Sequence, residues 1–412
     1  MLVFVGLILV VVGLVHLYLW KRLVRDPLRR GWGRRLGGVV AVLLAVLLPA
    51  TLIGARGGHA AWLAWPGYLW LGLMFYLLVT LVPLELPRLA LVLLWRRRRR
   101  TEKVAGETRA VTGAMPAGHD GAGPSATAVT VAEGPSGDGG VERRLVLARG
   151  MAIFAGLTAA GVTGYGMKTA LGAPQLQRVQ LPLAKLPRGM DGTRVALVSD
   201  IHLGPLAGTH HVGRIVDLIN SVTADIVCIV GDLVDGSVAE LGRFAEPLAG
   251  IESRSGAYFV TGNHEYYSGF QPWVDEVARL GVRPLRNERV AIGGLDLAGV
   301  NDLGGRQYGD GPDFAKALGD RDPTRPVVLM AHQPVMATSA APFGVDLQVS
   351  GHTHGGQMAP FNLLVKLQQP VVSGFGRVDG VPVFVTNGAG FWGPPVRVGA
   401  PPQVTVIDLR SK

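Results

Sequence analysis

The sequence feature that most limits the possible folds of this chain is a set of four long runs without a charged side chain, all within the first 170 residues. They cover residues 1–20, 36–55, 60–84 and 150–167, and five glycines dilute the apolar character of the fourth. Crossing about 30 Å of hydrocarbon at about 1.5 Å per residue takes about 20 residues, so each run is long enough for a transmembrane helix. We therefore predict four spans, three of them within residues 1–100 and the fourth within 143–172.

The distribution of charge favours a membrane protein over a nucleic-acid-binding protein. The net charge of the 412 residues is +10, but residues 1–177 carry +12 and residues 178–412 carry −2. A basic excess confined to the apolar half is typical of loops that orient a protein in a membrane. We expect the lipid bilayer as a partner and no long nucleic acid, because the C-terminal half offers no basic surface. No sequence feature indicates an obligate protein partner.

The basic loops also predict the orientation. Seven Lys and Arg residues lie between the first two runs, and five arginines follow the third run at 96–100. Between the second run and the third, Arg56 is the one charged residue. The positive-inside rule places the two basic loops in the cytoplasm, so we predict a multi-pass protein of the cell membrane with an exoplasmic C-terminal domain. Two alternatives stay open, a signal peptide at the first run and a twin-arginine export signal at Arg143 and Arg144.

The remaining sequence divides into a linker and a domain. Residues 101–142 are rich in Gly, Ala, Thr, Ser and Pro, which predicts a disordered cytoplasmic linker. From residue 178 on, short apolar runs alternate with stretches of helical spacing such as 212–221 and 272–280, which predicts an α/β domain over 178–412. The predicted strands are 194–199, 225–230, 257–261, 326–331, 345–350, 382–386 and 403–409.

Five of these predicted strands end in polar motifs, which are D-x-H, G-D-x-x-D, G-N-H-E, H and G-H-x-H in chain order. Ligands of open α/β sheets bind beyond the carboxyl ends of strands, so we expect the motifs to meet. Carboxylate, imidazole and amide oxygen are ligands of divalent cations, and Asp232, on a Gly-flanked turn, can bridge two of them. Two cations about 3.5–4 Å apart can clamp a phosphoryl group and convert water to bound hydroxide. The motif residues are Asp200, His202, Asp232, Asp235, Asn263, His264, His332, His352 and His354.

The ordered set resembles the calcineurin-like metallophosphoesterase family over roughly residues 190–409, and G-H-T-H-G-G-Q is most similar to its bacterial membrane-associated branch. Four spans ahead of such a domain also resemble transmembrane proteins with a metallophosphoesterase domain. The resemblance implies an α/β sandwich of two β-sheets flanked by helices, preceded here by a four-helix transmembrane region. Any single motif is commonly a chance surface pair or a turn, so the interpretation depends on the complete order.

The resemblance also implies a role for each motif residue. His264 is the implied catalytic acid or electrostatic stabiliser near the leaving oxygen, and Asp235 holds its imidazole. The implied cofactors are two divalent metal ions (Mn, Fe or Zn), which share Asp232. The first ion is held by Asp200, His202, Asp232 and His354, and the second by Asp232, Asn263, His332 and His352.

The expected function is hydrolysis of a phosphomonoester, phosphodiester or pyrophosphate, in a small molecule or a lipid, by metal-bound hydroxide. The alternative is a membrane receptor or scaffold with a structural or inactive metal centre. Two further residues leave a choice. The segment 387–397 either lines the substrate mouth with Arg397 on a phosphate or, as we favour, is a structural loop with an exposed Arg397. Cys228 is expected to be a buried apolar residue and not a nucleophile.

Overall fold

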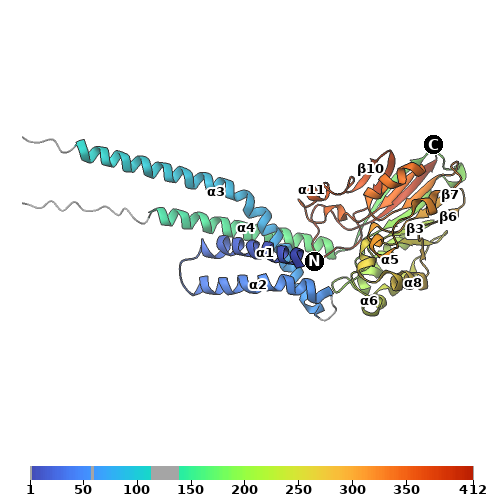
Figure 1. Cartoon of the computed structure of the whole chain (residues 1–412), viewed down its shortest axis with the longest axis horizontal. Coiled ribbons are helices and arrows are strands. Elements are labelled where there is room, and N and C mark those ends of the chain that lie inside the picture. Colours follow the sequence, from blue (N-terminus) through green and yellow to red (C-terminus); the bar gives the residue numbers. More distant parts are fainter. Residues whose placement is uncertain (1, 57–59, 113–138, 412) are drawn as a thin grey trace, which may run out of the picture. The chain divides into compact units, whose positions relative to one another are not determined.

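The computed structural model describes residues 2–56, 60–112 and 139–411. The chain divides into two compact units by its internal contacts. One unit contains Met1–Val46 and Leu73–Gly161, and we call it the helical unit. The other contains Leu47–Gly72 and Val162–Lys412, and we call it the sheet unit. The sheet unit therefore includes the ends of three long helices as well as the predicted C-terminal domain (Figure 1).

Four long helices cover most of the four predicted spans, although the third helix begins at Ala64, four residues after the predicted start of its span (Figure 1). Each has a segment long and apolar enough to cross a membrane. Many of their large apolar side chains are exposed, as for Leu43 at 63% and Leu157 at 70%, and such a surface is suited to lipid and not to water. The helices are α1 (Leu2–Trp20), which continues as a π-helical segment at Lys21–Arg25, α2 (Trp32–Arg56), α3 (Ala64–Thr112) and α4 (Gly139–Leu171).

The predicted linker differs from the structure at both ends. Helix α3 continues to Thr112, and α4 already begins at Gly139, so residues 101–112 and 139–142 are helical. The stretch 101–112 has one glycine, no proline and several good helix formers, and the Gly-rich and Pro-rich composition begins only after it. The rest of the predicted linker, residues 113–138, lies outside the described residues.

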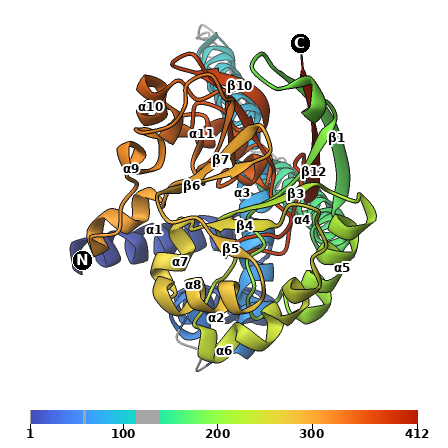
Figure 2. The ribbon, with the colours of Figure 1, turned by 90° about the vertical axis from the view of Figure 1, so that its right-hand side faces the viewer.

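The sheet unit is built on two six-stranded sheets, which confirms the predicted α/β sandwich (Figure 2). The first sheet has the order β1-β12-β2-β3-β4-β5 and the second has the order β10-β11-β9-β8-β7-β6. The strands are β1 (Gln175–Leu183), β2 (Thr193–Val198), β3 (Ile226–Val230), β4 (Ala257–Val260), β5 (Arg283–Pro284), β6 (Glu288–Ile292), β7 (Leu295–Gly299), β8 (Val327–Met330), β9 (Leu347–Ser350), β10 (Gly374–Val378), β11 (Val381–Val385) and β12 (Gln403–Ser411).

Alternating apolar side chains on the strands form the layers of the sandwich. In β2, Val195 and Leu197 belong to the core between the sheets, whereas Ala196 and Val198 pack in the core beneath the helices. Successive side chains of a strand point to opposite faces, so a strand buried on both faces is a continuous apolar run. The shorter helices are α5 (Thr209–Ser221), α6 (Val238–Ala245), α7 (Asn263–Tyr267), α8 (Phe270–Arg279), α9 (Phe314–Leu318), α10 (Ala337–Ala340) and α11 (Asn362–Val365).

All seven predicted strands are present, and five further strands were not predicted. The sheet structure begins at Gln175, three residues before the predicted start of the domain, because β1 pairs in parallel with β12. Strands β1, β6 and β10 are largely exposed or half-buried over part of their length, and such strands show no continuous apolar run. Parallel pairing of β2 with β3, of β3 with β4 and of β8 with β9 directs their carboxyl ends alike within each sheet.

Candidate metal centre

The nine motif residues meet at the carboxyl ends of five strands. All nine belong to the sheet unit, and five of the seven metal-ligand candidates are buried, whereas Asn263 and His352 are half-buried. Three groups of carboxylates and imidazoles among them are close enough for their ligand atoms to lie within 4.8 Å of one another. Strand β2 is followed by Asp200 and His202, β3 by Asp232 and Asp235, β4 by Asn263 and His264, β8 by His332, and β9 by His352 and His354.

The first group consists of Asp200, His202 and His354. His354 Nε2 lies 3.4 Å from Asp200 Oδ1 and 3.0 Å from His202 Nε2. Burial, followed by the nearby His202, holds the pKa of His354 well below its usual range. A neutral imidazole with its Nε2 directed at a carboxylate and a second imidazole is the form that binds a cation.

The second group consists of Asp232, His332 and His352. His332 Nε2 lies 3.1 Å from Asp232 Oδ2, and the same Oδ2 lies 3.9 Å from His202 Nε2, so Asp232 stands between the two groups. His332 Nδ1 lies 2.8 Å from the Val230 carbonyl oxygen, to which it donates. That hydrogen bond fixes the ring and leaves Nε2 for a ligand.

One buried atom beside the second group has no hydrogen-bond partner, and it tests whether the donors fit a metal. It is Asn263 Oδ1. His332 Nε2 also makes no hydrogen bond, but it lies within ion-pair distance of Asp232 Oδ2. Leaving a buried polar atom unpaired costs about 1–3 kcal/mol, so a native protein has a reason to keep it. Amide oxygen and imidazole nitrogen are both ligands of divalent cations, so the chemistry of these donors fits a metal.

The third group pairs His264 with Asp235. Asp235 Oδ1 lies 2.6 Å from His264 Nδ1 and 2.9 Å from His202 Nδ1. Burial lowers the pKa of His264, but Asp232 and Asp235 outweigh it and raise this pKa to about 9. Burial raises the pKa of Asp235, yet His202 and His264 hold it below its usual range. The pair is therefore a carboxylate that stabilises an imidazolium.

The backbone of the site is strained where it presents the ligands. Among the described residues outside glycine, positive φ occurs at five ligand candidates, with values between 50° and 71°. Glycines give the room that this arrangement needs, because a Cβ on Gly262 would collide with Asp232 and one on Gly351 with Ser199 and Asp200. The five strained residues are Asp200, His202, Asp232, His352 and His354.

Arg397 corrects the expectation of an exposed loop arginine. Its side chain is fully buried, and its guanidinium donates to the carbonyl oxygens of Gly390, Asn387, His354 and Ala400 at 2.7–3.1 Å. It also lies 3.2 Å from His354 Nδ1. Its hydrogen bonds are used within the protein, so Arg397 binds no phosphate and instead holds the turn that carries His354.

A cavity of about 480 Å³ opens beside the third group. Its lining includes the polar residues His202, Asp235 and His264 and the aromatic residues Phe391 and Trp392. Part of the segment 387–397 therefore lines the cavity. This agrees with the interpretation in which the segment lines the substrate mouth, although Arg397 itself has a structural role.

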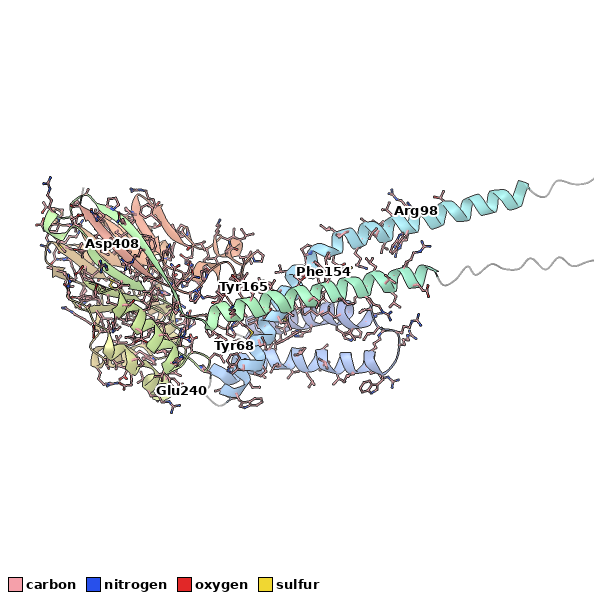
Figure 3. All side chains as sticks on the ribbon, turned by 180° about the vertical axis from the view of Figure 1, so that it is seen from behind. Tyr68, Arg98, Phe154, Tyr165, Glu240 and Asp408 are labelled. Carbon is pink, nitrogen blue, oxygen red and sulfur yellow. The ribbon has the colours of Figure 1, made fainter. Side chains whose placement is uncertain are left out.

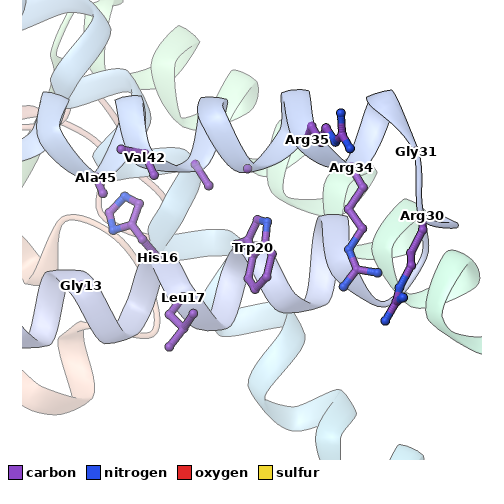
Figure 4. A pocket seen from close by; sticks show the side chains of 12 residues that line it. Gly13, His16, Leu17, Trp20, Arg30, Gly31, Arg34, Arg35, Val42 and Ala45 are labelled. Atoms are coloured by element: carbon purple, nitrogen blue, oxygen red, sulfur yellow. The ribbon is translucent and has the colours of Figure 1, made fainter.

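A larger cavity, of about 740 Å³, lies in the helical unit between α1 and α2 (Figure 4). His16, Trp20 and Arg34 are among its lining residues, which include no carboxylate. It therefore lacks the acidic ligands found in the sheet unit.

Comparisons with known proteins agree with this geometry. A family model for calcineurin-like phosphoesterases matches residues 193–356. The chain is 38% identical over 261 residues to a "Transmembrane protein with metallophosphoesterase domain" of Danio rerio, over 60% of each chain. It is 38% identical over 250 residues to an "Uncharacterized metallophosphoesterase" of Helicobacter pylori, over 60% of this chain and 67% of that protein. A similarly named protein of Aquifex aeolicus is 32% identical over 246 residues, which are 58% of this chain and 92% of that protein.

The chain belongs to the calcineurin-like phosphoesterase family. All nine motif residues of this calcineurin-like phosphoesterase lie inside the matched segment 193–356. Helices α1 to α4 lie outside it, and the match covers 60% of the length of the Danio rerio relative.

Proposed function

We propose that this chain is a membrane-anchored phosphoesterase with a binuclear metal centre, which hydrolyses a phosphomonoester, a phosphodiester or a pyrophosphate. The observation that carries the proposal is the position of Asp232 between two groups of ligands that arrive from five strand ends. A carboxylate has two oxygens, so one Asp can face two cations and offset their repulsion.

The donors divide into two sets around Asp232. Asp200, His202 and His354 would hold one divalent cation together with Asp232, and Asn263, His332 and His352 would complete the site of the other. Such cations, when bound, supply Lewis-acid polarisation of a phosphoryl group and lower the pKa of a bound water. Carboxylate, imidazole and amide ligands accommodate Mn, Fe or Zn.

His264, oriented by Asp235, would supply the proton that the leaving group needs. His264 stays outside both ligand sets, because its Nδ1 donates to Asp235 Oδ1, and the residue lines the cavity. Asp235 orients the ring through Nδ1 and stabilises its protonated form. A positioned imidazolium can donate a proton to the departing oxygen, which typically contributes about 10²–10⁴-fold to the rate.

We propose further that α1 to α4 cross the cell membrane and that the sheet domain lies on the exoplasmic side. The support is the length and apolar character of the helices, together with the basic residues between α1 and α2 and after 95. An impermeant maleimide tests the orientation on an Arg254→Cys variant, since the Arg254 side chain is 78% exposed. Labelling of intact cells is expected, and labelling only after lysis would reverse the orientation.

The enzymatic proposal is tested on the purified full chain. Bound metal is measured by elemental analysis, and aryl monoesters, aryl diesters and lipid pyrophosphates are assayed with Mn²⁺, Fe²⁺ and Zn²⁺ in turn. Asp232→Asn should abolish most turnover and reduce the bound metal. Undiminished hydrolysis by metal-stripped Asp232→Asn would exclude the mechanism. Absence of turnover by the metal-loaded chain, with tight binding of a phosphorylated ligand, would favour the receptor alternative.

A further inference from the structure

The cavity beside His264 has one wall from a candidate membrane helix. Tyr68 of α3 lines it, four residues after the helix begins at Ala64 (Figure 3). A Cβ on Gly393 would lie 3.8 Å from the Tyr68 ring, so the chain segment that follows Trp392 contacts this helix. Tyrosine at the end of an apolar helix is typical of the boundary between lipid and water. The cavity is therefore located where α3 would leave the membrane.

The end of α4 is attached to the same segment. The Arg397 backbone N–H donates to the carbonyl oxygen of Gly166 in α4 at 2.9 Å. A Cβ on Gly166 would collide with Val396, which shows how closely helix and segment pack. The segment 391–398 thus joins the entrance of the site to two candidate spans within the sheet unit.

Aromatic side chains form part of the lining of the cavity beside His264. The rings of Trp392 and Tyr267 lie 5.9 Å and 5.4 Å from the His264 ring, between centroids. Trp392 is 50% exposed, yet Gln357 holds its backbone by two hydrogen bonds at 2.9 Å and 3.0 Å. This aromatic wall (Tyr68, Tyr267, Tyr308, Phe391 and Trp392) is a preformed apolar surface beside the proposed acid.

The charges of the cavity restrict what else a substrate can carry. Its lining among the described residues includes Asp235 and Glu240 but no Lys or Arg. A nucleotide or a sugar bisphosphate brings several negative charges, and protein sites for such ligands use Arg, Lys or helix termini. An acidic and aromatic lining instead suits a ligand with one phosphate group and an otherwise apolar body.

A second group of exposed apolar side chains lies on a segment that is bonded to 391–398. Leu363, Leu364 and Leu367 are 60%, 58% and 84% exposed, on and just after α11. The segment before α11 is bonded to the segment 391–398, to which α4 is also bonded. In this second contact the Ala359 N–H donates to the Val398 carbonyl oxygen at 3.0 Å. Clustered exposed leucines beside candidate spans are typical of a surface that enters the lipid interface.

We infer that the substrate of the proposed phosphoesterase is a membrane lipid with a single phosphate ester group, whose apolar part lies against the aromatic wall. The inference rests on the proposed function, because the phosphate must reach the ligand groups. The lipid enters from the bilayer that surrounds α3 and α4, with its phosphate directed at His264.

The decisive experiment varies only the acyl chains. The full chain in phosphatidylcholine vesicles is supplied with Mn²⁺, Fe²⁺ and Zn²⁺ in turn and assayed with dioleoyl phosphatidic acid or dioleoyl phosphatidylglycerol in the bilayer. The matched soluble substrates are the dihexanoyl forms, with an aryl phosphate and ADP as references. We expect kcat/KM for a dioleoyl ester to exceed that for its dihexanoyl form by at least about tenfold.

The outcomes separate this inference from the proposed function. Equal or better turnover of a dihexanoyl ester or of ADP would overturn the lipid substrate and leave the phosphoesterase. Absence of turnover with every ester would overturn both.

A matched pair of tryptophans tests the aromatic wall. Trp392 and Trp62 are both exposed residues of the sheet unit, at 50% and 73%, and only Trp392 lines the cavity. Trp392→Ala should lower kcat/KM for the dioleoyl ester by about tenfold and that for the aryl phosphate by less than about threefold. Trp62→Ala should match the unsubstituted chain. Equal losses for both esters in Trp392→Ala would overturn the assignment of this wall to the lipid.

Discussion

Glu265 Oε2 accepts a hydrogen bond from the backbone N–H of Asp232 at 3.0 Å. The same carboxylate accepts from the N–H groups of Leu233 and Gly262, at 2.7 Å and 2.5 Å. It is fully buried, and burial followed by the charge of Asp232 raises its pKa to about 7. One side chain thus joins the turn that presents Asp232 to the turn that presents Asn263.

Glu265→Gln should destabilise this junction. The amide has only one oxygen, so its NH₂ group must face at least one of the three backbone donors, at a cost of about 1–3 kcal/mol. We expect a lower thermal unfolding midpoint and less bound metal, measured by fluorescence and elemental analysis. Glu246→Gln is the matched control, because that carboxylate is 54% exposed and its ion pair contributes little. Equal effects of the two substitutions would contradict the role of Glu265.

His264→Ala should affect esters according to their leaving groups. If His264 donates a proton to the departing oxygen, an alkyl phosphate should lose about 10²–10⁴-fold in kcat, and an aryl phosphate with an acidic leaving group much less. The pKa of about 9 means that the imidazolium is present below that pH and is lost above it. A basic limb in the pH profile of kcat should therefore disappear in the variant. An equal loss for both esters would point to a structural role.

Metal uptake should be opposed by protons. Burial lowers the pKa of His332, but Asp232 and Asp200 raise it well above the usual value, so His332 carries a proton at neutral pH before a cation binds. The cation must displace that proton, so affinity should rise with pH, by up to about tenfold per pH unit below this pKa. Calorimetry in buffers of different ionisation enthalpy measures the released protons. Uptake that does not change between about pH 6 and 8 would contradict the expectation.

Cys228 should resist alkylation in the folded chain. Its side chain is fully buried in β3, and burial raises the pKa of its thiol to about 12. The thiolate is the reactive form, so iodoacetamide at about pH 8 should leave the native protein unmodified and label it after unfolding. Mass spectrometry gives the modified fraction. Rapid labelling of the native chain would mean that the sandwich opens at β3.

Arg397→Lys should weaken the turn that carries His354. A single ammonium cannot replace a planar guanidinium that donates to four carbonyl oxygens in different directions. We expect a fall in the unfolding midpoint and in metal content that the exposed control Arg254→Lys does not show. An unchanged metal content in Arg397→Lys would separate this arginine from the metal centre.

Much of the sheet unit could be predicted because its central strands are buried on both faces. The runs at 226–230 and 327–330 are apolar, short and followed by polar motifs, so both the strands and the place of the motifs follow from one pattern. The structure brings all nine motif residues together, as their order suggested. Their individual roles stay proposals.

The features that could not be predicted depend on contacts between residues far apart in the sequence. Edge strand β1 is half covered, so it lacks an apolar run. Arg397 lies in a stretch rich in Gly and Pro that is typical of an exposed loop, and its partners range from residue 354 to residue 400. Tyr68 precedes Trp392 by more than three hundred residues, and only the folded sheet unit shows that both line one cavity.

The positive φ values of the five ligand candidates have a consequence for how this protein can evolve. Each left-handed residue other than glycine costs about 1–2 kcal/mol, and the folded chain carries five of them in one place. A glycine at any of these positions would relax the turn while deleting a donor. Selection for a more stable fold and selection for metal binding therefore act on these five positions in opposite directions. In a homologue that no longer needs the metal centre, we expect substitution by glycine at these positions first.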